Sequence, residues 1–133
     1  MPVPDPTPRS TDPLRVLVVD ADDRVRESLT GLLAIGGRLS VVGGAGLPGP
    51  ALDLAVATHP DVVIVDPRLP DVDAGTAFIG RLHELVPDAR VLAMSWSENL
   101  EHVGTAVDAD GFVRKTFRPA ELIAAIMSCG PAA

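Results

Sequence analysis

Short apolar runs alternate along the chain with stretches in which apolar residues recur at helical spacing. A short continuous apolar run is typical of a buried strand, whereas apolar residues three and four positions apart predict a helix with one face on the core. The runs predict five strands, near residues 16–19, 39–42, 62–65, 91–94 and 112–113. The spaced residues predict helices near residues 25–33, 51–58, 78–85 and 98–107, and a last helix beginning at Pro119.

Strands that are apolar on both faces and alternate with helices predict a parallel sheet with helices on both sides. Right-handed crossovers then give an α/β fold with a doubly wound five-stranded parallel sheet, whose sites lie beyond the carboxyl ends of the strands. Residues 1–13 contain five prolines and almost nothing apolar, so we expect a flexible tail there. The globular domain is expected over residues 14–128, followed by a C-terminal tail at residues 129–133.

The composition narrows the classes of function. A length of 133 residues fits one domain. The net charge of −7 disfavours direct binding to nucleic acid, whose phosphates would repel the chain. No apolar run reaches the roughly 18 residues of a membrane span, and the single cysteine, Cys129, excludes an internal disulfide. The sequence therefore predicts a cytoplasmic protein that contacts neither nucleic acid nor a membrane.

Charged and hydroxyl side chains stand where the predicted strands end. The first strand ends at Asp20, with Asp22 close behind, the third at Asp66, the fourth at Ser95 and the fifth at Lys115. Because the carboxyl ends of parallel strands converge at one edge of the sheet, we expect these side chains to gather there. Carboxylates suit Mg²⁺, and a carboxylate can also accept a phosphoryl group. Lysine and serine can stabilise the charge that moves onto the transferred oxygens.

Four segments of the chain resemble successive parts of one family, the receiver domains of bacterial response regulators. They read LRVLVVDADDRVRESL, DVVIVDPRLPDVDAG, VLAMSWSE and GFVRKTFRPAELIAAI, and the resemblance covers about residues 14–128. The DPRLP run and the ELIAAI ending are most similar to the NarL type, whose receivers usually precede a DNA-binding domain. The resemblance implies the flavodoxin-like receiver fold. It also implies a regulatory domain rather than an enzyme, at most self-phosphorylating and self-dephosphorylating.

The family assigns a role to each residue at the sheet edge. Asp66 matches the phosphoacceptor, and Asp20 matches the first of an acidic pair that organises Mg²⁺. The backbone carbonyl of Arg68 would be a further metal ligand. Ser95 matches the hydroxyl that hydrogen-bonds the phosphoryl group, and Lys115 matches the lysine that pairs with it.

The resemblance also implies a switch and its partners. Phe112 matches the aromatic residue whose rotamer, together with a shift of Ser95, reports the active state. The face made by the fourth helix, fifth strand and fifth helix would then change and meet a partner or a second copy of the chain. A sensor histidine kinase or a small phosphodonor would supply the phosphoryl group, and the expected output is regulation of transcription.

Three positions depart from the family pattern. Ala21 stands where the family usually has its second acidic residue, so Mg²⁺ binding is expected to be weakened, with Asp22 as a further candidate ligand. Trp96 follows Ser95 where a small residue is usual, and it could crowd the entrance to the site. Thr116 follows Lys115 where many receivers have a cis proline, and because a cis bond before a residue other than proline is costly, a trans bond or a shifted loop is expected there. The first departure leaves a second interpretation open, in which the chain is a degenerate receiver that binds a protein or ligand without being phosphorylated.

A glycine motif offers a different interpretation. Gly44, Gly46 and Gly49 form G-x-G-x-x-G between a predicted strand and a predicted helix, the outline of a dinucleotide-binding site. Pro48 stiffens that loop, and the motif leaves the acidic cluster at Asp20 unexplained, so we prefer a glycine-rich connection. No arrangement of a serine or cysteine nucleophile with histidine is apparent in the sequence, which argues against a hydrolase.

Overall fold

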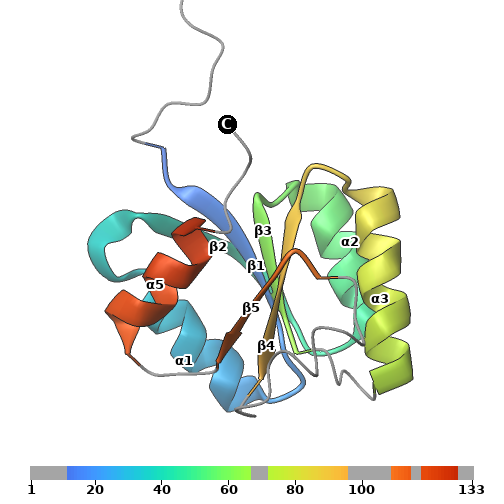
Figure 1. Cartoon of the computed structure of the whole chain (residues 1–133), viewed down its shortest axis with the longest axis horizontal. Coiled ribbons are helices and arrows are strands. Elements are labelled where there is room, and N and C mark those ends of the chain that lie inside the picture. The colour runs from blue at the N-terminus through green and yellow to red at the C-terminus, as the bar shows by residue number, and fades with distance from the viewer. Residues whose placement is uncertain (1–11, 67–71, 96–108, 115–117, 129–133) are drawn as a thin grey trace, which may run out of the picture.

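The computed structural model of the chain describes residues 12–66, 72–95, 109–114 and 118–128. Within them, five strands form one parallel sheet in the order β2-β1-β3-β4-β5, with helices on both faces (Figure 1). The strands are β1 Leu14–Val19, β2 Leu39–Ala45, β3 Val62–Val65, β4 Arg90–Ser95 and β5 Gly111–Arg114. The helices are α1 Asp23–Leu33, α2 Pro48–Thr58, α3 Val72–Leu85, α5 Pro119–Ser128 and the short 3₁₀ helix η1 Ile35–Gly37. The predicted doubly wound parallel sheet is confirmed.

Successive residues of the central strands face two separate cores, because side chains alternate between the faces of a sheet. Leu17 and Val19 pack in the core that includes residues of α2 and α3, whereas Val16 and Val18 pack in the core that includes residues of α1 and α5. Figure 1 shows these two helix pairs on opposite sides of the sheet. A strand that is apolar at every position therefore serves both cores, and the two cores together hold the sheet on which the site is built.

The first helix ends as its glycines predict. Helix α1 stops at Leu33, and Gly36 and Gly37 in η1 have φ angles of 82° and 69°. In this left-handed region glycine avoids the strain that a Cβ would bring. The turn lets the chain reverse and enter β2.

Several element boundaries differ from the prediction; α3, for example, begins at Val72, well before residue 78. Helix α2 begins at Pro48 rather than at residue 51. A proline is compatible with the first helical position, because the N–H that it lacks has no helical partner there. Strand β2 extends past residue 42 to Ala45, because Gly43 and Gly44 pair with β1 despite their lack of side chains.

Some predictions fall on parts of the chain that the structure does not describe. The helix predicted over residues 98–107, nearly all of the N-terminal tail and the tail at 129–133 lie outside the described residues. In the described part of the chain, none of the helices has the length and apolar character needed to span a bilayer.

Candidate functional site

The carboxyl ends of β1 and β3 lie side by side because the two strands pair directly. Val19 pairs with Val65 in parallel register, and the backbone amide of Asp66 donates a hydrogen bond of 3.0 Å to the carbonyl oxygen of Val19. Asp20 and Asp66 therefore follow adjacent strand ends. Since β2 lies on one side of β1 and β3 on the other, this is the switch point of the doubly wound sheet, where such folds bind their ligands.

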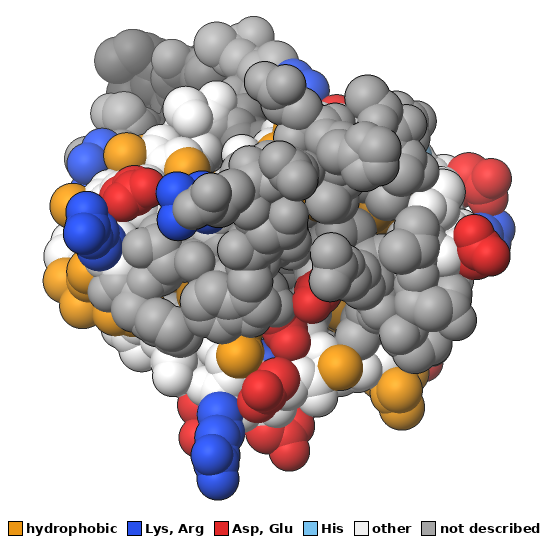
Figure 2. Space-filling model, turned by 60° about the horizontal axis from the view of Figure 1, so that its bottom comes forward, with side chains coloured by type: hydrophobic (Ala, Val, Ile, Leu, Met, Phe, Trp, Pro, Cys, Tyr) orange, Lys and Arg blue, Asp and Glu red, His pale blue; other side chains and the backbone are white. Residues whose placement is uncertain are grey.

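Acidic side chains gather on the surface at this edge of the sheet. Figure 2 turns the lower side of Figure 1, where the strands end, toward the viewer and shows several carboxylates close together there. Asp22 and Asp23 are exposed, Asp66 is half-buried, and Asp20 is buried. Carboxylates that range from buried to exposed therefore lie at this edge, and their negative charge favours the binding of a cation.

Asp20 is the one buried charged side chain among the described residues, with 2% of its surface exposed. One of its carboxylate oxygens, Oδ1, accepts a hydrogen bond of 2.9 Å from the backbone amide of Asp22. Its own backbone amide donates to the carbonyl oxygen of Ala45 at 3.1 Å. A buried carboxylate is costly unless hydrogen bonds or a cation compensate it. The structure therefore holds Asp20 at a fixed place beside the end of β3.

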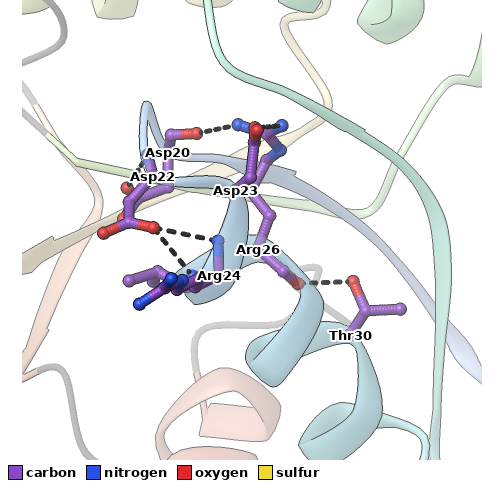
Figure 3. Close-up of polar contacts among 7 residues, drawn as sticks. Asp20, Asp22, Asp23, Arg24, Arg26 and Thr30 are labelled. Atoms are coloured by element: carbon purple, nitrogen blue, oxygen red, sulfur yellow. Dashed lines mark hydrogen bonds and ion pairs between the residues drawn. The ribbon is translucent and has the colours of Figure 1, made fainter.

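Asp22 has a structural role at the start of α1 (Figure 3). Its Oδ1 atom accepts hydrogen bonds from the backbone amides of Arg24 at 2.9 Å and Val25 at 3.4 Å. Aspartate is among the preferred N-cap residues, and a negative charge at the N-terminus of a helix also interacts favourably with the helix dipole. One oxygen of Asp22 is therefore engaged in capping, and the role of this residue as a metal ligand stays a prediction.

Sequence reasoning missed the contribution of Arg26 to this edge. Its Nη1 atom donates a hydrogen bond of 2.6 Å to the backbone carbonyl of Asp20, and its Nη2 atom pairs with the carboxylate of Asp23 (Figure 3). The available signal in the sequence was an arginine on the second turn of the helix that follows the acidic cluster. The guanidinium of Arg26 on α1 thus holds the loop between β1 and α1 in place.

The structure describes the other predicted site residues in part. The backbone of Ser95 ends β4 and pairs with Arg114 of β5. Because β4 runs parallel to β3, with Ala93 opposite Val65, Ser95 lies at the same edge as Asp66. Lys115 and Arg68 lie outside the described residues.

The structure also describes Phe112, the residue expected to act as a switch, and Ala21, which departs from the family pattern. Phe112 lies on β5, pairs with Ala93 and is 38% exposed. Ala21 is exposed next to Asp20 and contributes no carboxylate. The described part of the edge therefore supplies two strand-end carboxylates, from β1 and β3.

This set of donors suits a magnesium ion. Carboxylates are the hard oxygen ligands that Mg²⁺ prefers, and Mg²⁺ is usually held by one or two of them while it keeps several waters. No group of three or more His, Cys, Asp or Glu side chains placed to hold a metal ion occurs within the part of the chain that the structure describes. Asp20 and Asp66 are therefore the two strand-end carboxylates that could contribute to such a site.

Known proteins are similar in sequence to most of the chain. The family model of the response regulator receiver domain matches residues 16–127. The DNA-binding transcriptional activator DevR/DosR of Mycobacterium tuberculosis is 34% identical over 119 residues, which cover 88% of this chain and 54% of that protein. The nitrate/nitrite response regulator protein NarL of Escherichia coli K12 is 27% identical over 117 residues, covering 86% and 54%. The chain thus spans about half the length of these relatives.

A solved structure supports the same assignment of the fold. The two-component response regulator of the LuxR family from Aurantimonas sp. SI85-9A1 superposes with a TM-score of 0.75 at 29% sequence identity. The superposition covers 87% of this chain and 84% of that one. The similarity therefore extends over most of the chain.

Proposed function

Since the chain belongs to the receiver domain family of response regulators and is similar to the NarL type, we propose that Asp66 is its phosphoacceptor. Receiver domains are signal-transduction modules of two-component systems, and this chain is one of them. The observation that carries the proposal is the place of Asp66. This residue follows β3 at the switch point of the sheet, directly beside the end of β1 and its buried Asp20.

In the proposed reaction, a carboxylate oxygen of Asp66 attacks the phosphorus of a phosphohistidine on a sensor kinase, or of a small phosphodonor such as acetyl phosphate. A phosphorus–oxygen bond to Asp66 forms while the bond to the donor breaks, and the imidazole or acetate leaves with the electron pair. Asp20, Asp66 and the backbone carbonyl of Arg68 would hold Mg²⁺, with weaker affinity because Ala21 supplies no carboxylate. Mg²⁺, when bound, would neutralise charge on the phosphoryl oxygens.

We assign the remaining roles to residues that follow or end β4 and β5. Ser95 would hydrogen-bond the phosphoryl group and Lys115 would pair with it. The pairing of Ser95 with Arg114 supports this assignment, because Lys115 is the next residue after Arg114. The partial exposure of Phe112 on β5 supports its role as a switch whose rotamer changes with Ser95.

The proposed partners follow from the same reaction. A sensor histidine kinase or a small phosphodonor would load Asp66, and a second copy of the chain is a candidate partner of the switched face. Regulation of transcription is proposed because relatives about twice as long include a DNA-binding transcriptional activator. The cytoplasmic location expected from the sequence stays a prediction.

A second candidate function rests on Ala21. Without the second acidic residue, the described edge offers fewer carboxylates to a cation than the family pattern provides. The domain would then be a degenerate receiver whose switched face is set by binding of a protein or ligand rather than by phosphorylation. Whether the site responds to Mg²⁺ and a phosphoryl mimic distinguishes the two functions.

The fluorescence of Trp96, the single tryptophan and the sequence neighbour of Ser95, provides the test. Mg²⁺ is added first and beryllofluoride, a mimic of aspartyl phosphate, second. We expect a saturable change in the wild type that Asp66→Asn abolishes. Asp61→Asn is the matched control, because Asp61 stands before the first residue of β3 and its carboxylate accepts the amide of Arg15 at 2.9 Å. Equal responses of the wild type and Asp66→Asn would contradict the proposal.

A further inference from the structure

The guanidinium of Arg26 lies where three segments meet. Its Nη1 atom contacts the carbonyl of Asp20 at the end of β1, and its Nη2 atom pairs with Asp23 at the start of α1 (Figure 3). The third segment is the connection between β2 and α2. There, a Cβ added to Gly46 would lie 2.7 Å from Nη1 and 3.6 Å from the carbonyl oxygen of Asp20. One side chain therefore lies against both loops beside the switch point.

We propose that Arg26 is a positioning residue for the phosphorylation site and that Gly46 is a glycine because the guanidinium occupies the space of its missing side chain. The inference rests on the proposed function, since it concerns the residue that would hold Mg²⁺ beside Asp66. Arg26 fixes the backbone carbonyl of Asp20, while the amide of Asp22 fixes its carboxylate. The buried acid is thus held at both its main chain and its side chain.

The chemistry of arginine suits this position. Its planar guanidinium presents several N–H donors at fixed angles, so it can bind two acceptors in different directions at once. Hydrogen bonds from a charged donor are also stronger than neutral ones. The side chain of Arg26 is 23% exposed, so water competes only in part with its contacts. The hydroxyl of Thr30 donates to the carbonyl oxygen of Arg26 at 2.8 Å and holds the backbone that carries it.

The glycine motif gains a physical explanation from this contact. A Cβ on Gly49 would meet nothing within 4 Å, and a Cβ on Gly44 would lie at ordinary contact distance, 3.6 Å from the carbonyl oxygen of Val18 and 3.7 Å from Cδ of Arg26. Gly46 is therefore the one glycine of the motif where a side chain is excluded by a close neighbour. That neighbour is Arg26. In a dinucleotide-binding site, the second glycine of the motif instead leaves room for the pyrophosphate of the ligand.

Gly46 also provides a selective way to disturb Arg26. The atom that a Cβ would strike is the far end of a flexible side chain, so Gly46→Ala should displace the guanidinium and leave the backbone in place. Gly44→Ala is the matched control, because it adds the same methyl group two residues earlier in the chain and near the same arginine without a close contact. Arg81→Ala is a second control, since Arg81 pairs with Glu84 at the same i,i+3 spacing on α3.

The first measurement needs neither metal nor phosphodonor. The backbone amide of Asp22 donates to the carboxylate of Asp20, so its hydrogen exchange, followed by NMR, reports how firmly that carboxylate is held. We expect Arg26→Ala and Gly46→Ala to accelerate this exchange by about tenfold, and the two controls to leave it unchanged. Wild-type exchange at Asp22 in Arg26→Ala would overturn the inference, whatever the metal affinity of the protein.

The second measurement links the position of Arg26 to the site. Mg²⁺ titrations followed by Trp96 fluorescence should give a several-fold weaker affinity for Arg26→Ala and for Gly46→Ala. Because both variants act through the same guanidinium, Gly46→Ala should cause no further loss in the Arg26→Ala background. Additive losses would show that Gly46 acts independently of Arg26 and would overturn the pairing. If the wild type itself binds no Mg²⁺, the proposed function fails, and hydrogen exchange alone decides the role of Arg26.

Discussion

The carboxylate of Asp20 accepts a hydrogen bond of 2.9 Å from the backbone amide of Asp22, so the residue that caps α1 also orients the buried acid at the end of β1. The two aspartates are only two positions apart, yet their surroundings differ. Asp20 is buried beside the end of β3, whereas Asp22 is exposed and points an oxygen at the first amides of α1. We therefore expect substitutions at the two positions to affect different properties of the protein.

Asp20→Asn should weaken Mg²⁺ binding by about tenfold or more, equivalent to about 1.4 kcal/mol. The amide oxygen of asparagine can still accept the Asp22 amide, so the fold should persist while the negative charge is lost. Isothermal titration with Mg²⁺ measures the effect. Asp61→Asn removes the same charge at the opposite end of β3 and should leave the affinity unchanged. An Asp20→Asn protein with wild-type affinity would show that this carboxylate is not a ligand.

Asp22→Ala should lower the free energy of unfolding by about 0.5–2 kcal/mol, the usual cost of losing an N-cap. Asp22→Asn should be nearly as stable as the wild type, because asparagine caps helices about as well as aspartate. Urea denaturation followed by circular dichroism gives both values. A loss of Mg²⁺ affinity in Asp22→Asn as large as that in Asp20→Asn would instead identify Asp22 as a metal ligand.

Ala21→Asp should strengthen Mg²⁺ binding by about tenfold, since a further carboxylate within a few ångströms of the ion adds on the order of 1–4 kcal/mol of attraction near a protein surface. Position 21 is exposed, so the new carboxylate costs little desolvation. Ala21→Asn adds a similar side chain without the charge and serves as the control. Equal affinities of the wild type and Ala21→Asp would show that this position does not face the ion.

The fold was largely predictable because its strands are apolar on both faces and end in polar residues. The run at 62–65 predicts β3 with its observed bounds, Val62–Val65. The extension of β2 through Gly43 and Gly44 was not predictable, because hydrogen bonds to β1 stabilise it and glycine itself has no preference for a strand. The start of α2 at Pro48 was missed because a proline suits a loop and the first turn of a helix equally well.

The site was predictable to the extent that it depends on where strands end. Asp20 and Asp66 follow neighbouring parallel strands, and their proximity follows from topology alone. Aspartate is a preferred N-cap residue, so one of Asp22 and Asp23 is expected to cap α1. Which of the two does so, and the contact between Arg26 and the carbonyl of Asp20, depend on the path of the β1–α1 loop. Several conformations of that loop are compatible with the same sequence pattern, so these two relationships required the structure.

Intact-mass measurement after incubation with acetyl phosphate and Mg²⁺ shows whether Asp66 is phosphorylated. We expect one added phosphoryl group in the wild type and in Asp61→Asn, and none in Asp66→Asn. Hydroxylamine should release the group, because it cleaves acyl phosphates and leaves phosphoserine intact. A wild-type protein that gains no mass, or an Asp66→Asn protein that gains as much as the wild type, would contradict the assignment of Asp66 as the phosphoacceptor.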